Sequence, residues 1–137
     1  MALTHLADTS VLSRLGADPV RDVLEPLVES GSVARAGITD LEVGFSARDS
    51  AEWDGLIQAL SAFELIESTA AHVARARQVQ RQLADSRLRD RKVPDLLIAS
   101  AAEERGLIVL HYDADFDTIS SVTGQPVEWV VARGSID

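Results

Sequence analysis

Three carboxylates stand close together near the end of the chain, directly after an apolar run. In the stretch LIVLHYDADFD, residues 107–117, Asp113, Asp115 and Asp117 occupy alternate positions. Carboxylates this close repel each other unless water solvates them or a cation neutralises them. The pattern therefore indicates either a solvated turn or a site that needs negative charge to hold a cation.

A bound cation would give these acids a chemical role. Hard divalent cations such as Mg²⁺ and Mn²⁺ take oxygen ligands, and Mg²⁺ uses few carboxylates while it keeps several waters. Such an ion removes the repulsion between the acids, lowers the pKa of a bound water and stabilises the charge that develops when a phosphodiester is displaced. Phosphodiester cleavage is thus a reaction that these side chains can support.

The spacing of the aspartate run does not fit an EF-hand or a phosphoaspartyl site. An EF-hand loop that began at Asp113 would need Gly at its sixth position and Glu at its twelfth, where the chain has Thr118 and Gly124. A phosphoaspartyl enzyme or receiver domain also needs a lysine late in the fold, whereas the only lysine, Lys92, precedes this segment. The sequence contains no P-loop, GxGxxG, GxSxG or HExxH motif.

Short strands and helices alternate along the chain and must position the acids. The predicted strands cover residues 4–8, 32–37, 64–68, 107–111 and 127–131. The predicted helices cover residues 9–15, 18–30, 39–47, 50–63, 69–86, 94–105 and 116–122. We read Asp18, Thr39 and Ser50 as N-caps, and Pro94 and Gly106 as the start and stop signals of one helix. Apolar strands separated by helices predict a parallel five-stranded sheet covered on both faces, in a single α/β domain over residues 1–137.

The topology of such a sheet brings several acids to one edge. Functional crevices lie outside the carboxyl ends of parallel strands, and Asp8 and Asp113 each follow a predicted strand. Glu42 lies in the first turn of the helix after the second strand, which begins at the same edge. Asp95 also lies in the first turn of a helix, but no strand directly precedes it, so topology alone does not place it.

Each of these acids could also serve the fold alone. Asp8 can cap the helix that follows it, and Asp113 can be a polar turn residue. Residues 39–42 match a capping box, in which Glu42 would only bond back to the Thr39 amide. Asp95 faces a helix dipole favourably. Taken together, four acids at strand ends or first helical turns form the arrangement that a divalent cation site requires.

Charge limits the classes of partner. The chain of 137 residues has a net charge of −9, which argues against bulk attraction to nucleic acid. Cations nevertheless gather between Arg75 and Lys92, in a strip that leads directly to Asp95. The last members of this strip are predicted to contact nucleic-acid phosphates, and the alternative is a solvated helix face. They are Arg87, Arg89, Arg91 and Lys92.

Composition also bears on the compartment. The absence of cysteine fits a reducing cytosol, no apolar run approaches the length of a membrane span, and the first residues lack the features of a signal peptide. We therefore expect a cytoplasmic protein. His72 is expected on a helix surface, His5 and His111 at strand flanks, and Trp53 and Trp129 in the core or an interface.

Four motifs, in this order and spacing, resemble the PIN-domain ribonucleases, and among them the VapC toxins of bacterial toxin–antitoxin pairs. They are LADTS, TDLEVGFSAR, VPDLLIASAA and VLHYDADFD, and the resemblance runs from Leu6 to about Val131. The resemblance implies that the acidic run belongs to a metal site.

The family's functional residues carry over onto matching positions of this sequence. The catalytic acids implied are Asp8, Glu42, Asp95 and Asp113, and Asp115 is the implied accessory acid. The family's small hydroxyl residue matches Thr9 or Ser10. We assign the metal to Asp8, Asp95 and Asp113, whereas Asp117 has a weaker claim and is assigned as a helix cap.

The resemblance further implies a fold, a reaction and partners. The fold is a three-layer α/β/α sandwich around a parallel five-stranded sheet, and the protein is a homodimer. The reaction is Mg²⁺- or Mn²⁺-dependent endonucleolytic cleavage of structured RNA, often tRNA or rRNA. The partner is a VapB-type antitoxin whose C-terminal segment enters the active-site groove.

Two alternatives to a toxin nuclease stay open. In one, the fold is a non-enzymatic binding module or co-repressor partner and the acids are only caps. In the other, the protein is a PIN-type nuclease that acts in RNA maturation without an antitoxin.

Overall fold

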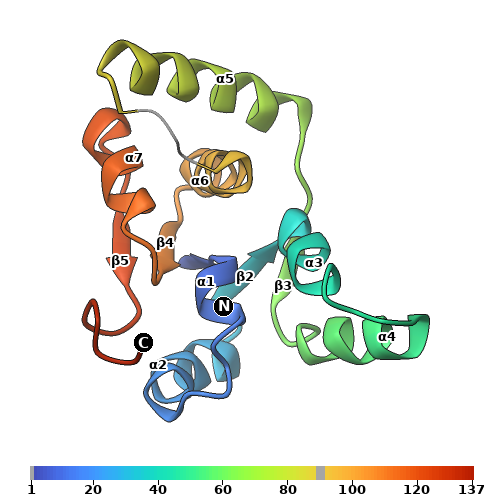
Figure 1. Cartoon of the computed structure of the whole chain (residues 1–137). Coiled ribbons are helices and arrows are strands. Elements are labelled where there is room, and N and C mark those ends of the chain that lie inside the picture. Colours follow the sequence, from blue (N-terminus) through green and yellow to red (C-terminus); the bar gives the residue numbers. More distant parts are fainter. Residues whose placement is uncertain (1, 89–91) are drawn as a thin grey trace.

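Five short strands form one parallel sheet in the order β3-β2-β1-β4-β5 (Figure 1). The structure is a computed structural model that describes residues 2–88 and 92–137. The strands are β1 (His5–Ala7), β2 (Val33–Ala36), β3 (Glu64–Ile66), β4 (Ile108–His111) and β5 (Val127–Trp129). The predicted parallel five-stranded sheet is confirmed, and β1 lies at its centre between β2 and β4.

Helices cover both faces of this sheet (Figure 1). They are α1 (Thr9–Leu12), α2 (Asp18–Glu29), α3 (Gly37–Gly44), α4 (Ser50–Ala59), α5 (Ala70–Asp85), α6 (Val93–Arg105) and α7 (Asp115–Thr123). One apolar cluster joins the sheet to α5, α6 and α7, and a second joins it to α1 and α2. The expected three-layer α/β/α sandwich is therefore confirmed.

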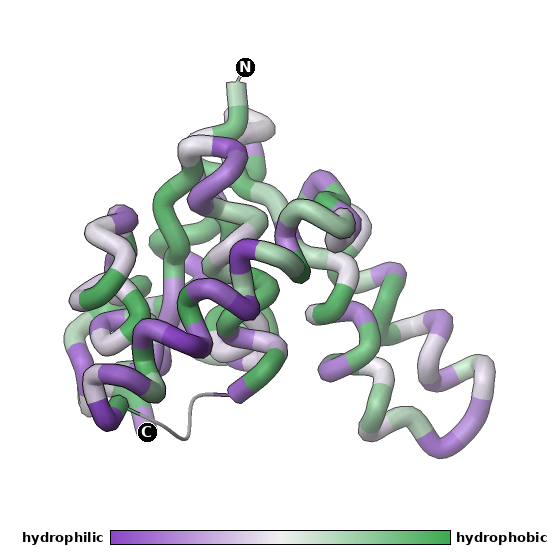
Figure 2. The backbone as a smooth tube through the Cα atoms, turned by 90° about the horizontal axis from the view of Figure 1, so that it is seen from above, coloured by the Kyte–Doolittle hydropathy of each residue, from purple (hydrophilic) through white to green (hydrophobic). Residues whose placement is uncertain are grey.

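Side chains that alternate along the strands build these two clusters. Leu6 and Val109 belong to the cluster under α6, whereas their neighbours Ala7 and Leu110 belong to the cluster under α1 and α2. This alternation follows from the two-residue period of a strand. Along the helices, hydrophobic and hydrophilic residues also alternate, as helices with one face on a sheet require (Figure 2). None of the helices within the described ranges has the length and apolar character that crossing a bilayer demands.

Two predicted helix starts are wrong by a small amount. Asp49, and not Ser50, caps α4, because its side chain accepts the Glu52 amide at 2.8 Å. Asp18 is the first residue of α2 and does not cap it, since Ala17 occupies the N-cap position. By contrast, α6 carries Pro94 in its first turn and ends at Gly106, whose φ of +67° suits glycine, as predicted.

The start of α3 corrects the predicted capping box. The helix begins at Gly37 directly after β2, so Thr39 lies inside the helix and does not cap it. Thr39 is fully buried, and its hydroxyl meets the hydroxyl of Thr9 at 2.8 Å. Because the chain turns from strand to helix at Ala36, no position is left for a capping box at residues 39–42.

His72 also differs from its prediction, because it is buried and not on the helix surface. Its Nδ1 accepts the Thr69 amide at 3.2 Å, which completes a capping box at the start of α5. The hydrogen of the imidazole is therefore on Nε2, which donates to Glu104 on α6 at 2.7 Å. This contact fastens α5 to α6.

Arg35 holds α3 and the end of α4 against β2. Its buried guanidinium donates to Asp40 at 2.7 Å and to the carbonyls of Leu60 and Phe63 at 2.9 and 2.6 Å. Asp40 lies in the first turn of α3, the helix that carries Glu42. Arg35 therefore fixes the position of Glu42 relative to the sheet.

Replacing Arg35 by Met should destabilise the fold strongly. The substitution leaves the Asp40 carboxylate and two carbonyls without their buried partner, which costs about 3 kcal/mol. Urea unfolding measures this loss. As a control, Arg48→Met removes an exposed pair with Glu52 and should cost less than about 0.5 kcal/mol. Equal losses in the two variants would show that Arg35 is not an anchor.

Candidate metal centre

Three acids gather where α6 and α7 begin. Asp95, Asp113 and Asp115 each offer a carboxylate oxygen, and these atoms lie within 4.8 Å of one another. Asp95 is in the first turn of α6, Asp115 opens α7, and Asp113 lies in the loop between β4 and α7. Because α6 packs on β1 and β4, its N-terminus brings Asp95 to the edge where those strands end. The structure thus places the acid whose position topology left open.

Asp8 lines a cavity next to the group of three acids but is not a member of that group. The cavity has a volume of about 240 Å³, and Glu42, Asp95 and Asp113 also line it. Asp8 is the N-cap of α1 and accepts the Ser10 amide at 2.9 Å through Oδ2. Its structural role as a cap is therefore real. The metal ligands predicted from the sequence included Asp8 and not Asp115, and that set stays a prediction.

Capping accounts for only one of the two oxygens of Asp8. Its Oδ1, and likewise Oδ2 of Asp95, is buried without a hydrogen-bond partner among the residues that the structure describes. A buried carboxylate oxygen without a partner is costly, and a cation would compensate for it. These two oxygens, together with an all-oxygen donor set, fit a hard divalent cation.

Burial and mutual repulsion shift the pKa values of these acids. Burial raises the pKa of Asp8 to about 6, and Glu42 adds to the shift by repulsion. Burial, followed by repulsion from Asp8 and Asp113, raises the pKa of Asp95 to about 8. A divalent cation must displace the proton that Asp95 holds near neutral pH, and below about pH 6 it must displace that of Asp8 as well.

Asp113 behaves differently because it has close donors. Its Oδ1 accepts the Asp115 amide at 2.9 Å, and its Oδ2 accepts the Lys92 ammonium at 3.1 Å. Burial alone would raise the pKa of Asp113, but the amide of Asp115 and the charge of Lys92 outweigh it and lower the pKa. Asp113 therefore stays ionised, with the Lys92 ammonium beside it.

Glu42 is held by Thr9, whose hydroxyl in turn bonds to Thr39. Thr9 Oγ1 donates to Glu42 Oε1 at 2.6 Å, and Thr39 Oγ1 lies 2.8 Å from Thr9 Oγ1. Because the one hydroxyl hydrogen of Thr9 goes to the carboxylate, Thr39 is the donor to Thr9. Of the two hydroxyl residues singled out from the sequence, Thr9 thus contacts Glu42 through its hydroxyl, whereas Ser10 contacts Asp8 through its backbone amide and accepts the Tyr112 amide at its hydroxyl. Thr39 is a member of this site that sequence reasoning took for a cap.

His111 holds the backbone of Asp113 in place through a hydrogen bond. This residue is fully buried at the end of β4, and its Nδ1 accepts the Asp113 amide at 3.2 Å. Asp117, predicted to cap α7, does not cap it, since Ala114 is the N-cap. Instead, Asp117 accepts the indole hydrogen of Trp129 at 3.0 Å and lies 3.7 Å from His111 Nε2. The only signal for His111 in the sequence is its place two residues before Asp113.

The basic strip is only partly described. Lys92 lines the acidic cavity and pairs with Asp113. Arg87 is exposed just after α5, with a φ of 59°. Arg89 and Arg91 lie outside the described residues. Arg75, at the start of the strip, pairs with Glu103 on α6 at 2.7 Å. The RNA-binding role of residues 87–92 stays a prediction.

The sequence belongs to a known family. The profile of the PIN domain family matches residues 6–121, and the chain is therefore a member of that family. It is 62% identical over 137 residues to Ribonuclease VapC51 of Mycobacterium tuberculosis, with full coverage of both chains. It is also 44% identical to Ribonuclease VapC21 of the same organism, over 98% of this chain and 99% of that one.

Solved structures show the same fold at lower identity. The DNA-bound VapBC of Salmonella typhimurium matches 94% of this chain and 99% of its own, with a TM-score of 0.77 at 19% identity. A toxin–antitoxin complex from Klebsiella pneumoniae matches 93% and 98%, with a TM-score of 0.73 at 23% identity. The PIN fold is thus shown by both sequence and structure.

The raised pKa of Asp95 predicts that metal-free protein loses stability as pH rises. With a folded-state pKa of about 8 against an ordinary 3.8, the folded protein holds a proton that the unfolded chain releases. This contribution is present at lower pH and is lost as pH rises through about 8. In EDTA, stability should fall by up to about 1 kcal/mol per pH unit between about pH 6.5 and about pH 8. Burial lowers the pKa of His111, so this residue contributes in the opposite direction, chiefly near and below its ordinary pKa of 6.5.

Thermal unfolding across this pH range tests the prediction. Asp95→Asn should flatten the pH dependence, whereas Asp54→Asn, on the exposed face of α4, should preserve it. Millimolar Mg²⁺ or Mn²⁺ should raise the melting temperature of the wild type, and more at the higher pH, where fewer protons compete. Equal metal-induced shifts in the wild type and Asp95→Asn would contradict a metal site at Asp95.

Proposed function

We propose that this protein is a metal-dependent endoribonuclease and the toxin of a toxin–antitoxin pair, which cleaves structured cellular RNA such as tRNA or rRNA. The observation that carries the proposal is a pair of buried oxygens, one of Asp8 and one of Asp95, beside the group of Asp95, Asp113 and Asp115; within residues 2–88 and 92–137 neither oxygen has a hydrogen-bond partner. Helix caps do not require these oxygens, so the alternative in which the acids are only caps gives these oxygens no role. The identity of 62% to a named VapC ribonuclease supports the reaction.

Each proposed site residue has a role that its surroundings support. Asp8, Asp95 and Asp113 would hold the cation, with Asp115 as the accessory acid. The cation, Mg²⁺ or Mn²⁺, supplies charge stabilisation and a water of lowered pKa when it is bound. Thr9 fixes Glu42 at the cavity wall, where its carboxylate can accept a proton from the attacking water. Ser10 holds Asp8 through its amide.

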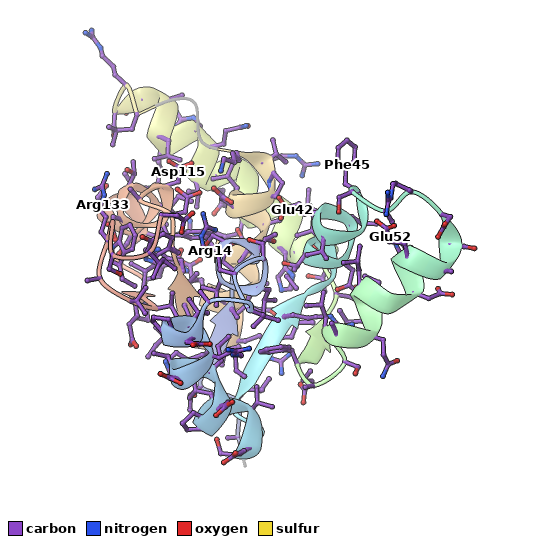
Figure 3. The ribbon with its side chains drawn as sticks, turned by 60° about the horizontal axis from the view of Figure 1, so that its bottom comes forward. Arg14, Glu42, Phe45, Glu52, Asp115 and Arg133 are labelled. Atoms are coloured by element: carbon purple, nitrogen blue, oxygen red, sulfur yellow. The ribbon has the colours of Figure 1, made fainter. Side chains whose placement is uncertain are left out.

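An apolar groove next to the acidic cavity supports the proposal that an antitoxin binds this protein. A cavity of about 420 Å³ between α1, α3 and α4 shares Thr9, Ser13 and Glu42 with the acidic cavity. Its apolar lining, which includes Leu56, suits the apolar face of a helix, and the acids at its end suit an Arg or Lys that imitates the cation. Nearby, just after α3, Phe45 is 91% exposed and points away from the protein (Figure 3).

Three further parts of the proposal rest on the core, the family resemblance and the composition. We propose one domain over residues 1–137, because both apolar clusters pack on the same sheet. We also propose a homodimer and a location in the cytoplasm, as the resemblance and the lack of cysteine suggest.

Conservative substitutions of the acids should abolish RNA cleavage while the fold survives. Asp8→Asn removes a ligand charge, and Glu42→Gln keeps the hydrogen bond from Thr9 but cannot take a proton. Each variant should cleave total bacterial RNA at least about 100-fold more slowly than the wild type in Mg²⁺ or Mn²⁺. Gel analysis against an EDTA blank measures the rate, and urea unfolding checks the fold. A stable Glu42→Gln protein with full activity would reject the proton-accepting role.

A charge placed in the apolar groove should weaken antitoxin binding and leave the nuclease activity intact. Leu56→Asp buries a carboxylate against the incoming helix, so affinity should fall by about tenfold or more. Co-expression with the small reading frame adjacent to the gene, followed by co-purification, measures binding. Gln58→Asp, at an exposed position of the same helix, is the matched control. Unchanged co-purification of Leu56→Asp would place the partner elsewhere, and the absence of any partner would favour RNA maturation.

A further inference from the structure

Arg14 is a cation in the acidic cavity that the proposed mechanism does not use. It follows α1 and lines the cavity together with Lys92 and the acids. Its Nη1 donates to the carbonyl of Ser10 at 2.7 Å, and its guanidinium carbon lies 5.0 Å from the centre of the Tyr112 ring. Two contacts therefore hold the guanidinium at the cavity wall. Figure 3 shows Arg14 on the side of the molecule that also carries Glu42 and Asp115.

The remaining donors of Arg14 meet the side chain of Asp137. Nε donates to Oδ1 at 3.0 Å and Nη2 donates to Oδ2 at 2.9 Å, which is a bidentate pair. A guanidinium presents the same fork to a carboxylate and to a phosphate. Asp137 thus occupies the donors with which Arg14 would bind a phosphate oxygen pair.

The segment that carries Asp137 is laid against this wall. Ser135 closes a turn onto the carbonyl of Ala132 at 3.0 Å, and the Ile136 amide donates to the Tyr112 hydroxyl at 3.3 Å. Ile136 also packs on the apolar cluster under α1 and α2. In the ion pair between Arg14 and Asp137, the Arg14 side chain is partly exposed and the Asp137 side chain is 57% exposed. Solvent and other anions therefore compete with this pair.

The negative charge of the cavity bears on what the ion pair between Arg14 and Asp137 can do. Acids dominate the cavity, so an RNA phosphate needs a positive partner there in addition to any cation. Of the two positive side chains that line the cavity within the described residues, Lys92 is committed to Asp113 at 3.1 Å. Arg14 is the one whose partner lies at the exposed rim and can leave without uncovering a site acid.

We propose that Arg14 binds an RNA phosphate at the candidate active site and that Asp137 is an internal, displaceable ligand that occupies Arg14 until RNA arrives. The inference rests on the proposed ribonuclease function. It assigns to residues 132–137 a restraining role on substrate binding. In the alternative, Arg14 only anchors these residues to Tyr112.

RNA binding in EDTA, where metal-dependent cleavage does not proceed, separates these two roles of Arg14. The probe is a fluorescein-labelled, single-stranded RNA of mixed sequence, followed by fluorescence anisotropy over a range of salt. Arg14→Gln should weaken binding by about tenfold and reduce the slope of log affinity against log salt by about 0.7, which is the loss of one phosphate contact. Asp137→Asn should tighten binding by roughly threefold, because it frees the fork.

The double variant excludes a bulk charge effect. If Asp137 acts through Arg14, the double variant should bind like Arg14→Gln alone. Asp54→Asn and Arg48→Gln remove the same charges at exposed positions away from the cavity and should leave affinity nearly unchanged. If Asp137→Asn tightens binding equally with and without Arg14, or if Arg14→Gln binds like the wild type, the inference is wrong.

Cleavage assays keep this outcome separate from that of the proposed function. If the wild type cleaves RNA and Arg14→Gln leaves both KM and the salt slope unchanged, only the role of Arg14 fails. If the wild type cleaves no RNA in Mg²⁺ or Mn²⁺ but binds it through Arg14, the nuclease function fails and the phosphate contact stands.

Discussion

Burial and mutual repulsion of the carboxylates that share one cavity form the constraint on which the rest of this structure depends. Several acids share one cavity, and burial raises the pKa of Asp8 to about 6 and that of Asp95 to about 8, so Asp95 holds a proton near neutral pH in the absence of a cation. The remaining structure must hold these groups in place against that repulsion. Asp8 and Glu42 are accordingly each anchored through one carboxylate oxygen, by an amide and by a hydroxyl, whereas Asp113 accepts the Asp115 amide through Oδ1 and Lys92 through Oδ2. Stability and metal binding therefore make opposite demands on the same side chains.

The sheet supplies the frame that makes this arrangement possible. β1 lies between β2 and β4, and the Asp8 amide continues the ladder by donating to the carbonyl of Leu110 at 2.9 Å. The residues that follow β1 and β4 therefore leave the sheet side by side. α6 packs on these strands, and its first turn brings Asp95 to the same place. Three segments far apart in the sequence thus meet at one point, and none of them could form the site alone.

Much of this frame could be predicted from the sequence, because local signals determine it. Apolar strands, Pro94 and Gly106 depend on neighbouring residues only, and the ends of parallel strands necessarily meet at one edge. The placement of Asp95 could not be predicted, since it depends on how α6 packs on strands distant in sequence. The buried position of His72 likewise depends on Glu104, which is 32 residues away.

The errors at Thr39 and Asp117 have the same physical origin. Both residue types bond readily to nearby backbone, so local reasoning assigns them to caps. In the folded protein a distant group competes successfully for each one: Thr9 for Thr39, and the Trp129 indole for Asp117. Arg14 shows the same limit, because nothing near it in sequence indicates its contact with Asp137.

Two hydrogen bonds at the Thr9 hydroxyl connect α1 to α3, one to Thr39 and one to Glu42. Thr39 and Glu42 are one helical turn apart on α3, and both reach the single hydroxyl of Thr9 on α1. A shift of α1 along α3 by one residue would break both bonds at once, because each threonine side chain is branched at Cβ and has few rotamers with which to follow. The two bonds therefore fix the register between α1 and α3, and they make the orientation of Glu42 depend on the position of the helix that Asp8 caps.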